Sequence, residues 1–117
     1  MTLTGIAILN GSAVAGNVST MLYRATGSLV AGSLSAATAQ SGTAAYQAFA
    51  CGTASLIPAG TYYVAVQFSS ASARFRSHVL GAFGAGKITS TVAGTAPSGV
   101  SPPTTFTTNL GPIASLY

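Results

Sequence analysis

The side chains that could do chemistry in this sequence are few, and three of them alternate along one stretch. Arg74, Arg76 and His78 lie two residues apart, so on a β-strand they would share one face. A basic row of this kind can bind an acidic surface, either of a partner protein or of an acidic glycan, or it can simply be solvated. We treat these three residues as candidates for partner binding.

A glycine-rich stretch, GAFGAGK at residues 81–87, matches the first seven positions of a phosphate-binding loop. Ile88 follows where such loops carry Ser or Thr, and the residues after it are typical of a strand. No helix N-terminus would therefore face a phosphate. We expect a glycine-rich connection between strands and no nucleotide.

The sequence contains no Asp and no Glu, and this absence excludes most hydrolytic and metal chemistry. Paired carboxylates, an acid-oriented catalytic triad and carboxylate-built Ca²⁺ or Mg²⁺ sites cannot be assembled from one such chain. Cys51 is the sole cysteine, so an intrachain disulfide is excluded and a zinc cluster lacks ligands. We expect a non-enzymatic protein without catalytic residues, metal or cofactor.

Charge and hydropathy narrow the choice of partners. Four basic residues give a net charge of +4, which favours an acidic partner but is too small and too scattered for nucleic acid. No segment reaches the ~18 apolar residues of a membrane span. Because so little charge protects weakly against self-association, we expect the chain to belong to an assembly, as a homo-oligomer.

The strongest strand candidate is residues 61–68, a run of β-branched and aromatic residues after the turn signal Pro58-Ala59-Gly60. The even-numbered residues of this run are apolar and fall on one face, which can fill a core. Tyr63 falls on the opposite face, where its ring could meet solvent, a partner or a sugar.

The rest of the chain repeats the pattern of short strands and turns. Further strands are predicted at residues 3–9, 18–24, 29–34, 44–50, 73–80, 87–92 and 104–108, with residues 51–57 as a connection. Seven to eight short strands predict an all-β fold, an antiparallel β-sandwich that is jelly-roll-like. We expect residues 1–96 to form the sandwich. The proline-rich residues 97–117 would form an arm that packs on the domain or on a neighbour, with contacts from Ile113, Leu116 and Tyr117.

Four stretches carry a resemblance to small β-sandwich virion proteins and fibre-tip domains of tailed bacteriophages. They are the hairpin MLYRATGSLV at residues 21–30, PAGTYYV at 58–64, ARFRSH at 73–78, and PPTTF at 102–106 with GPIASLY at 111–117. None of these stretches is a catalytic signature. PAGTYYV is also similar to strands of bacterial carbohydrate-binding and surface modules.

The resemblance implies a structural or adhesive role on the exterior of a virion, often as a homotrimer, after synthesis in the host cytoplasm. The partners would be other virion proteins, such as major capsid, fibre or tail subunits. The leading hypothesis is a protein that decorates or cements a capsid, or caps a fibre. The alternative is a glycan-binding module for host attachment, in which Tyr63 and the loop near Phe83 stack on sugar rings and Arg74 or Arg76 binds the acidic groups. The lack of acidic residues argues against a Ca²⁺-dependent lectin site.

Overall fold

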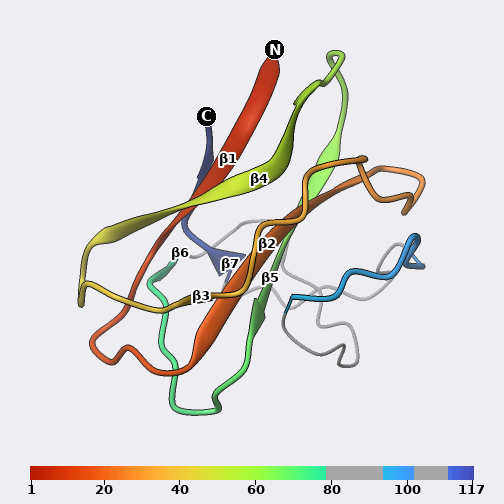
Figure 1. Cartoon of the computed structure of the whole chain (residues 1–117). Coiled ribbons are helices and arrows are strands. Elements are labelled where there is room, and N and C mark those ends of the chain that lie inside the picture. Colours follow the sequence, from red (N-terminus) through yellow and green to blue (C-terminus); the bar gives the residue numbers. More distant parts are fainter. Residues whose placement is uncertain (79–93, 102–110) are drawn as a thin grey trace.

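The computed structural model describes residues 1–78, 94–101 and 111–117, and in these ranges it contains strands and no helix (Figure 1). The predicted all-β class is confirmed. The strands are β1 (Thr2–Leu9), β2 (Asn17–Arg24), β3 (Thr38–Ala39), β4 (Tyr46–Leu56), β5 (Tyr62–Phe68), β6 (Ser77–His78), β7 (Gly111–Pro112) and β8 (Ala114–Leu116).

Several predictions lie outside the described residues. They are the strands at 87–92 and 104–108, the stretch GAFGAGK with Phe83 and Lys87, and the last two residues of the predicted strand at 73–80.

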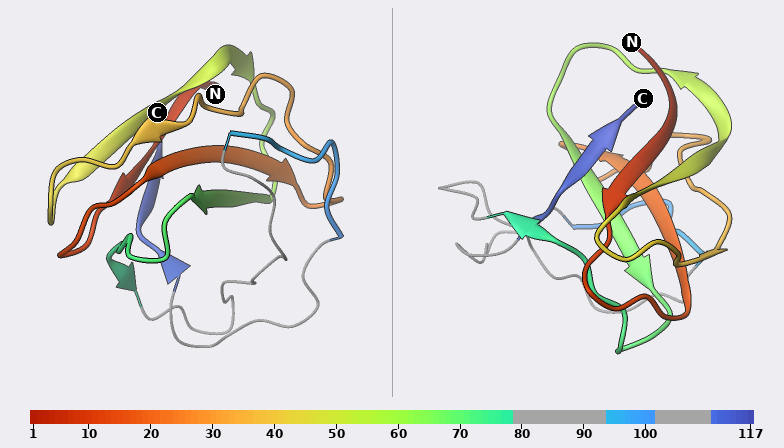
Figure 2. Two further views of the ribbon diagram at one scale, coloured as in Figure 1. Left: turned by 60° about the horizontal axis from the view of Figure 1, so that its bottom comes forward. Right: turned by 90° about the vertical axis from the view of Figure 1, so that its left-hand side faces the viewer.

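Two three-stranded antiparallel sheets make up the body, with the strand orders β4-β1-β8 and β3-β2-β5. Figure 2 shows β1 and β4 in one layer and β2 and β5 in the other. β6 and β7 pair as a small separate ladder. The arrangement is consistent with a small β-sandwich.

The hydrophobic core lies between the two sheets. Ile6 and Ile8 of β1 are fully buried on one face, as their alternation predicts, and Val64 and Val66 of β5 pack against them from the other sheet. Leu3 would fall on the opposite face by strict alternation, but a register shift in the pairing with β4 brings it into the same core.

Strand β2 is buried on both faces. Leu22 faces the core between the sheets, while Tyr23 on the other face is still only 2% exposed. Residues 94–101 cover that second face: the Tyr23 hydroxyl donates to the carbonyl oxygen of Pro97 (3.1 Å), and Gln67 Nε2 of β5 donates to that of Thr95 (3.0 Å). The predicted polar outer face of this sheet is therefore occupied by the chain's own later residues.

The predicted strand at residues 29–34 is wrong. Only Leu29 forms a bridge to β2. Beyond it, the Ser33 hydroxyl accepts from the Leu22 N–H (3.1 Å) and the Ser35 hydroxyl from the Thr20 N–H (2.9 Å). The backbone of residues 32–34 also accepts hydrogen bonds from β4. The segment therefore runs between β2 and β4, and side-chain hydroxyls take the place of backbone partners for part of β2.

Strand β4 is longer than predicted. It begins near the predicted start but continues to Leu56, so the predicted connection at residues 51–57 is wrong. The extension pairs with the first half of β1, with Thr2 opposite Leu56. At the other edge of β1, Leu116 of β8 lies opposite Ile6. The described parts of the predicted C-terminal arm thus pack on their own domain.

Candidate partner-binding site

The basic residues predicted to bind a partner lie on a segment that is held against the loop after β1. The Gly11 N–H donates to the Arg74 carbonyl oxygen (2.9 Å), and the Arg76 N–H donates to that of Leu9 (2.8 Å). The predicted strand at 73–80 is regular only within β6 among the described residues. It begins later than predicted because residues 73–76 pair largely with a loop, whose irregular path cannot support a continuous ladder.

A buried cluster of amide side chains supports this loop. Asn10 is fully buried, and its Nδ2 donates to the Ser41 carbonyl oxygen (2.6 Å) and to Gln47 Oε1 (3.1 Å). Gln40 Nε2 donates to Asn10 Oδ1 (2.9 Å) and to the Arg74 carbonyl oxygen (2.8 Å). The backbone beneath Arg74 is therefore held by a main-chain and a side-chain donor together.

Phe75 attaches the same segment to the second sheet. It lies opposite the buried Asn10, and its ring stacks on that of Phe68 at the end of β5, with 5.5 Å between centroids and 16° between planes. The side chain nevertheless remains 37% exposed. Phe75 thus offers part of an aromatic ring to solvent from a fixed position.

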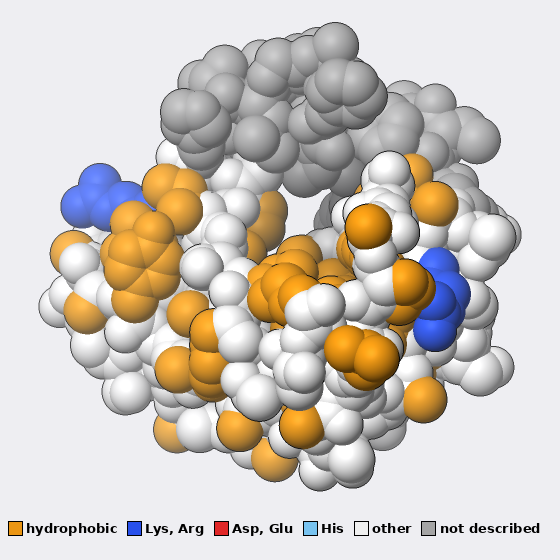
Figure 3. Space-filling view, turned by 90° about the horizontal axis from the view of Figure 1, so that it is seen from above, with side chains coloured by type: hydrophobic (Ala, Val, Ile, Leu, Met, Phe, Trp, Pro, Cys, Tyr) orange, Lys and Arg blue, Asp and Glu red, His pale blue; other side chains and the backbone are white. Residues whose placement is uncertain are grey.

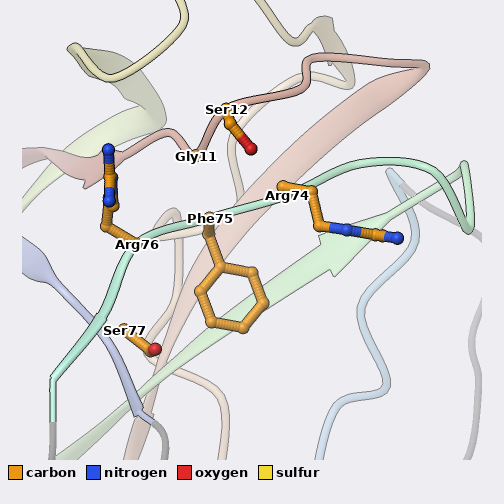
Figure 4. A pocket seen from close by; sticks show the side chains of 6 residues that line it. All are labelled: Gly11, Ser12, Arg74, Phe75, Arg76 and Ser77. Carbon is orange, nitrogen blue, oxygen red and sulfur yellow. The ribbon is translucent and has the colours of Figure 1, made fainter.

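An open groove of about 260 Å³ runs over this segment (Figure 4), lined by Gly11, Ser12, Arg74, Phe75, Arg76 and Ser77. Figure 4 shows the two arginine side chains leaving in different directions on either side of Phe75. Arg74 Nη1 donates to the carbonyl oxygens of Ala71 (2.9 Å) and Ala73 (3.1 Å), which ties its guanidinium to the adjacent turn. The guanidinium of Arg76 has no hydrogen bond to any described residue, so it is free to bind an anion.

The other predicted site residues do not line this groove. The backbone of His78 pairs with Gly111 in the β6–β7 ladder, next to the groove. Tyr63 is half-buried opposite Tyr23 in β5. It lies five residues before Phe68, roughly 16 Å along the strand, so it cannot share a small ligand with Arg76.

The three predicted C-terminal contacts have different positions. The Ile113 N–H donates to the Arg76 carbonyl oxygen (3.1 Å), which places Ile113 at the edge of the groove segment. Leu116 packs against the core of its own chain. Tyr117 is 43% exposed beside β1. Ile113 and Leu116 are half-buried, and Tyr117 keeps the most surface for a partner.

The groove residues Gly11, Ser12, Phe75 and Ser77 were not predicted as site residues. The turn signal Asn10-Gly11 was visible in the sequence, but residues 10–12 and 74–77 meet only through long-range backbone pairing. No local pattern could have shown that contact.

Two reactive side chains of the described residues, Cys51 and Tyr23, are not activated. Burial raises the pKa of the Cys51 thiol and of the Tyr23 phenol, so neither ionises more readily than usual.

Residues 1–78, 94–101 and 111–117 hold no group of three or more metal-ligating His, Cys, Asp or Glu side chains, and none of their segments is a helix that could cross a membrane. Figure 3 shows Lys and Arg atoms only in small separate groups on the face it displays. The arrangement supports anion binding.

Comparison with known proteins gives no match: no protein family, no curated protein and no solved structure is significantly similar to this chain. The resemblance to virion proteins therefore stays a prediction, and the function is argued from the site.

Proposed function

We propose that the protein is a non-enzymatic structural component of a bacteriophage particle, which docks on an acidic surface of a neighbouring virion protein. The observation that carries the proposal is the guanidinium of Arg76. It lies at the open groove and has no hydrogen-bond partner among the described residues. Because the chain has no acidic side chain, a side-chain carboxylate for this group has to come from another molecule.

The chemistry of the groove suits such a contact. A guanidinium binds a carboxylate through two parallel hydrogen bonds, a planar fork geometry that an ammonium group cannot offer. An exposed pair of this kind contributes only about 0–1 kcal/mol, so one site binds weakly. Many copies on a symmetric particle bind far more tightly through avidity, and a decorating or cementing subunit works in this way.

A binding experiment with poly-L-glutamate as the acidic probe tests the site. We expect Arg76→Gln to weaken binding about fivefold, which corresponds to ~1 kcal/mol. The matched control is Arg24→Gln, because Arg24 is exposed at the end of β2 that lies away from Phe68 and Phe75. Equal losses in both variants would mean that only net charge matters, and unchanged binding in both would exclude the groove.

The location in a particle is tested separately. Antibodies against the chain should label the exterior of particles purified from its source, as seen by electron microscopy. Purified particles that lack the protein would refute the structural role, whatever the result with poly-L-glutamate.

A second candidate function is the binding of an acidic glycan, and the exposed ring of Phe75 favours it. An aromatic ring between two arginines, with Ser12 and Ser77 in the same groove, can stack on a sugar while a guanidinium binds its carboxylate. On an array of acidic glycans, Phe75→Leu would keep an apolar contact with Phe68 and lose the stacking surface. A glycan hit that this variant abolishes supports the candidate, and an array without hits removes it.

A further inference from the structure

The dipeptide Asn10-Gly11 at the end of β1 is chemically labile whenever the chain is unfolded. Asparagine loses its side-chain amide most readily before glycine, because glycine has no Cβ to hinder the approach of its main-chain nitrogen. That nitrogen loses its proton and attacks Cγ of the asparagine, ammonia leaves, and a five-membered imide forms. Water then opens the imide at either carbonyl carbon, which leaves aspartate or isoaspartate in place of Asn10.

The fold holds both reacting groups away from this reaction. The Gly11 N–H donates to the Arg74 carbonyl oxygen (2.9 Å), so the nitrogen keeps its proton. The Asn10 side chain is fully buried, its Oδ1 accepts from Gln40 Nε2 (2.9 Å), and its Nδ2 donates to two further acceptors. The amide can therefore neither turn toward the Gly11 nitrogen nor meet water until this part of the structure opens.

Neither product of the reaction fits the folded chain. Aspartate would set a buried carboxylate oxygen against the Ser41 carbonyl oxygen and Gln47 Oε1, the two acceptors that now lie 2.6 and 3.1 Å from Asn10 Nδ2. A buried charge without a partner is strongly destabilising. Isoaspartate would add one atom to the main chain between Asn10 and Gly11, whose backbone groups both bond to residues 44–45 (2.9 and 2.8 Å). The register of those two bonds would be lost.

The same contact that forms the groove requires both labile residues. An added Cβ at Gly11 would lie 2.7 Å from Arg74 Cβ and 2.9 Å from the Arg74 carbonyl carbon, so loop 10–12 could not approach the groove segment as closely. At position 10, an amide supplies an acceptor for Gln40 and two donor hydrogens, which neither an apolar nor an ionised acidic side chain of this size can do. The fold therefore depends on a dipeptide that is unstable outside it.

We propose that Asn10 is a modification site that the fold protects: it deamidates in chains in which loop 10–12 is open, and a chain that has reacted no longer forms the groove. The inference does not depend on what the groove binds. Native chains are protected because folded proteins spend only about 10⁻³ to 10⁻⁶ of their time unfolded. Chains that fold late, or that unfold for long, are converted to a product that cannot return to the native structure.

Mass spectrometry measures the protection. The full chain is kept with a reductant at mildly alkaline pH, either folded or unfolded in guanidinium chloride, and is then digested with trypsin. Cleavage after Arg24 releases peptide 1–24, which contains Asn10 and, as an internal control, Asn17. In guanidinium chloride Asn10 should react much faster than Asn17, because the β-branched Val18 hinders attack at the second site. In the folded chain Asn10 should react at least about a thousandfold more slowly.

Two results of this measurement would overturn the proposal. One is equal deamidation of Asn10 in the folded and the unfolded chain, and the other is equal reaction of Asn10 and Asn17 in guanidinium chloride.

Refolding tests the consequence of the modification. Samples aged in guanidinium chloride are diluted into buffer, and circular dichroism measures the fraction that regains native structure. This fraction should fall in step with the deamidation of Asn10. The control is the same chain aged for the same time in guanidinium chloride at mildly acidic pH, where the Gly11 nitrogen keeps its proton. It should refold as a freshly unfolded sample does. Reacted chains that refold as well as this control would refute the proposal.

The variant Asn10→Asp isolates the aspartate product. At neutral pH its equilibrium constant for folding should be at least about tenfold below that of the wild type, because the buried carboxylate lacks a donor. Burial raises the pKa of this carboxyl group in the folded state, so the protonated form folds and stability is lost as the pH rises. The deficit should therefore narrow as the pH falls toward about 4, the ordinary pKa of aspartate. The chain has no other acidic side chain, so no other side-chain carboxyl group titrates in this range.

The matched control is Asn17→Asp, which adds the same charge at an exposed position and should match the wild type at every pH. Among the described residues, Arg74 and Arg76 are the charged groups on the segment packed against position 10, and both are exposed. If Asn10→Asp is as stable as the wild type at neutral pH, one of these guanidinium groups reaches the carboxylate, the modified chain folds, and the proposal is wrong.

Discussion

Replacing Gly5 by alanine tests the packing of the chain's two ends against each other. Gly5 is buried in the middle of β1, between β4 and Tyr117. An added Cβ would collide with the Tyr117 ring and would lie 2.7 Å from the Phe49 carbonyl oxygen. The ring can move aside, but the carbonyl oxygen belongs to a paired strand and cannot move without disturbing the ladder with β1.

The magnitude follows from two opposing effects. Forcing an extra carbon into a packed site costs about 1–3 kcal/mol. Gly5 has no positive φ, so alanine fits its backbone conformation and recovers about 0.4–1 kcal/mol through the lower entropy of the unfolded chain. We expect Gly5→Ala to lower the free energy of unfolding by about 1.3 kcal/mol, within a range of about 0–2.6 kcal/mol, out of a total of about 5–15 kcal/mol for a domain of this kind.

Urea denaturation followed by circular dichroism measures this difference. The matched control is Gly60→Ala, because a Cβ at Gly60 has its nearest neighbour at 3.5 Å on the Tyr62 ring and needs no rearrangement. The control should stay within about 0.5 kcal/mol of the wild type. The double variant Gly5→Ala/Tyr117→Leu should recover part of the loss. If Gly5→Ala is as stable as the wild type, the Phe49 carbonyl oxygen does not lie as close to Gly5 as the structure places it, and the reasoning is refuted.

Three further predictions concern the interior. Ser33→Ala should lower the free energy of unfolding by about 1–3 kcal/mol in urea, because the Ser33 hydroxyl bonds both the N–H (3.1 Å) and the carbonyl oxygen (3.2 Å) of Leu22; an unchanged midpoint would contradict that role. Thr20→Val should stabilise the protein by up to ~1 kcal/mol, because the buried Thr20 Oγ1 has no partner among the described residues; a loss of stability would show that this hydroxyl is bonded. Burial raises the pKa of Cys51 and Tyr23 above their ordinary values of 9.0 and 10.0, so the folded state keeps protons that the unfolded chain loses. The stability that these two protonated groups contribute should be complete below about pH 9 and should decline as the pH rises above it. The decline just above pH 9 should be smaller in Cys51→Ala, which lacks the thiol. A melting temperature that stays flat through this pH range would refute the reasoning.

Local alternation of side chains was sufficient to predict the principal strands. β1, β2 and β5 occur within one residue of their predicted bounds, and Ile6, Ile8 and Val64 face the core as their parity requires. Parity is a property of neighbouring residues, because successive side chains of an extended chain point to opposite sides whatever the strand pairs with. Parity did not describe the basic row correctly, because residues 73–76 are not a regular strand and the side chains of Arg74 and Arg76 leave in different directions.

Pairing partners could not be derived in this way. Nothing near Ser33 or Ser35 shows that their hydroxyls would complete the edge of β2, and nothing near Pro97 shows that its segment would cover Tyr23. The predicted strand at 29–34 failed because its residues have the right composition but are shared between two strands.

The amino-acid sequence by itself determined the strand-rich composition, the buried parity of the main strands and the lack of acidic groups, since these depend on each residue and its neighbours. Only the tertiary structure decided that loop 10–12 meets residues 74–77 to form the groove, and that β8 pairs with β1 to complete the first sheet. Contacts between residues far apart in the chain are selected by the free energy of the whole assembly of strands, in which each closure of a long loop has to be offset by burial elsewhere.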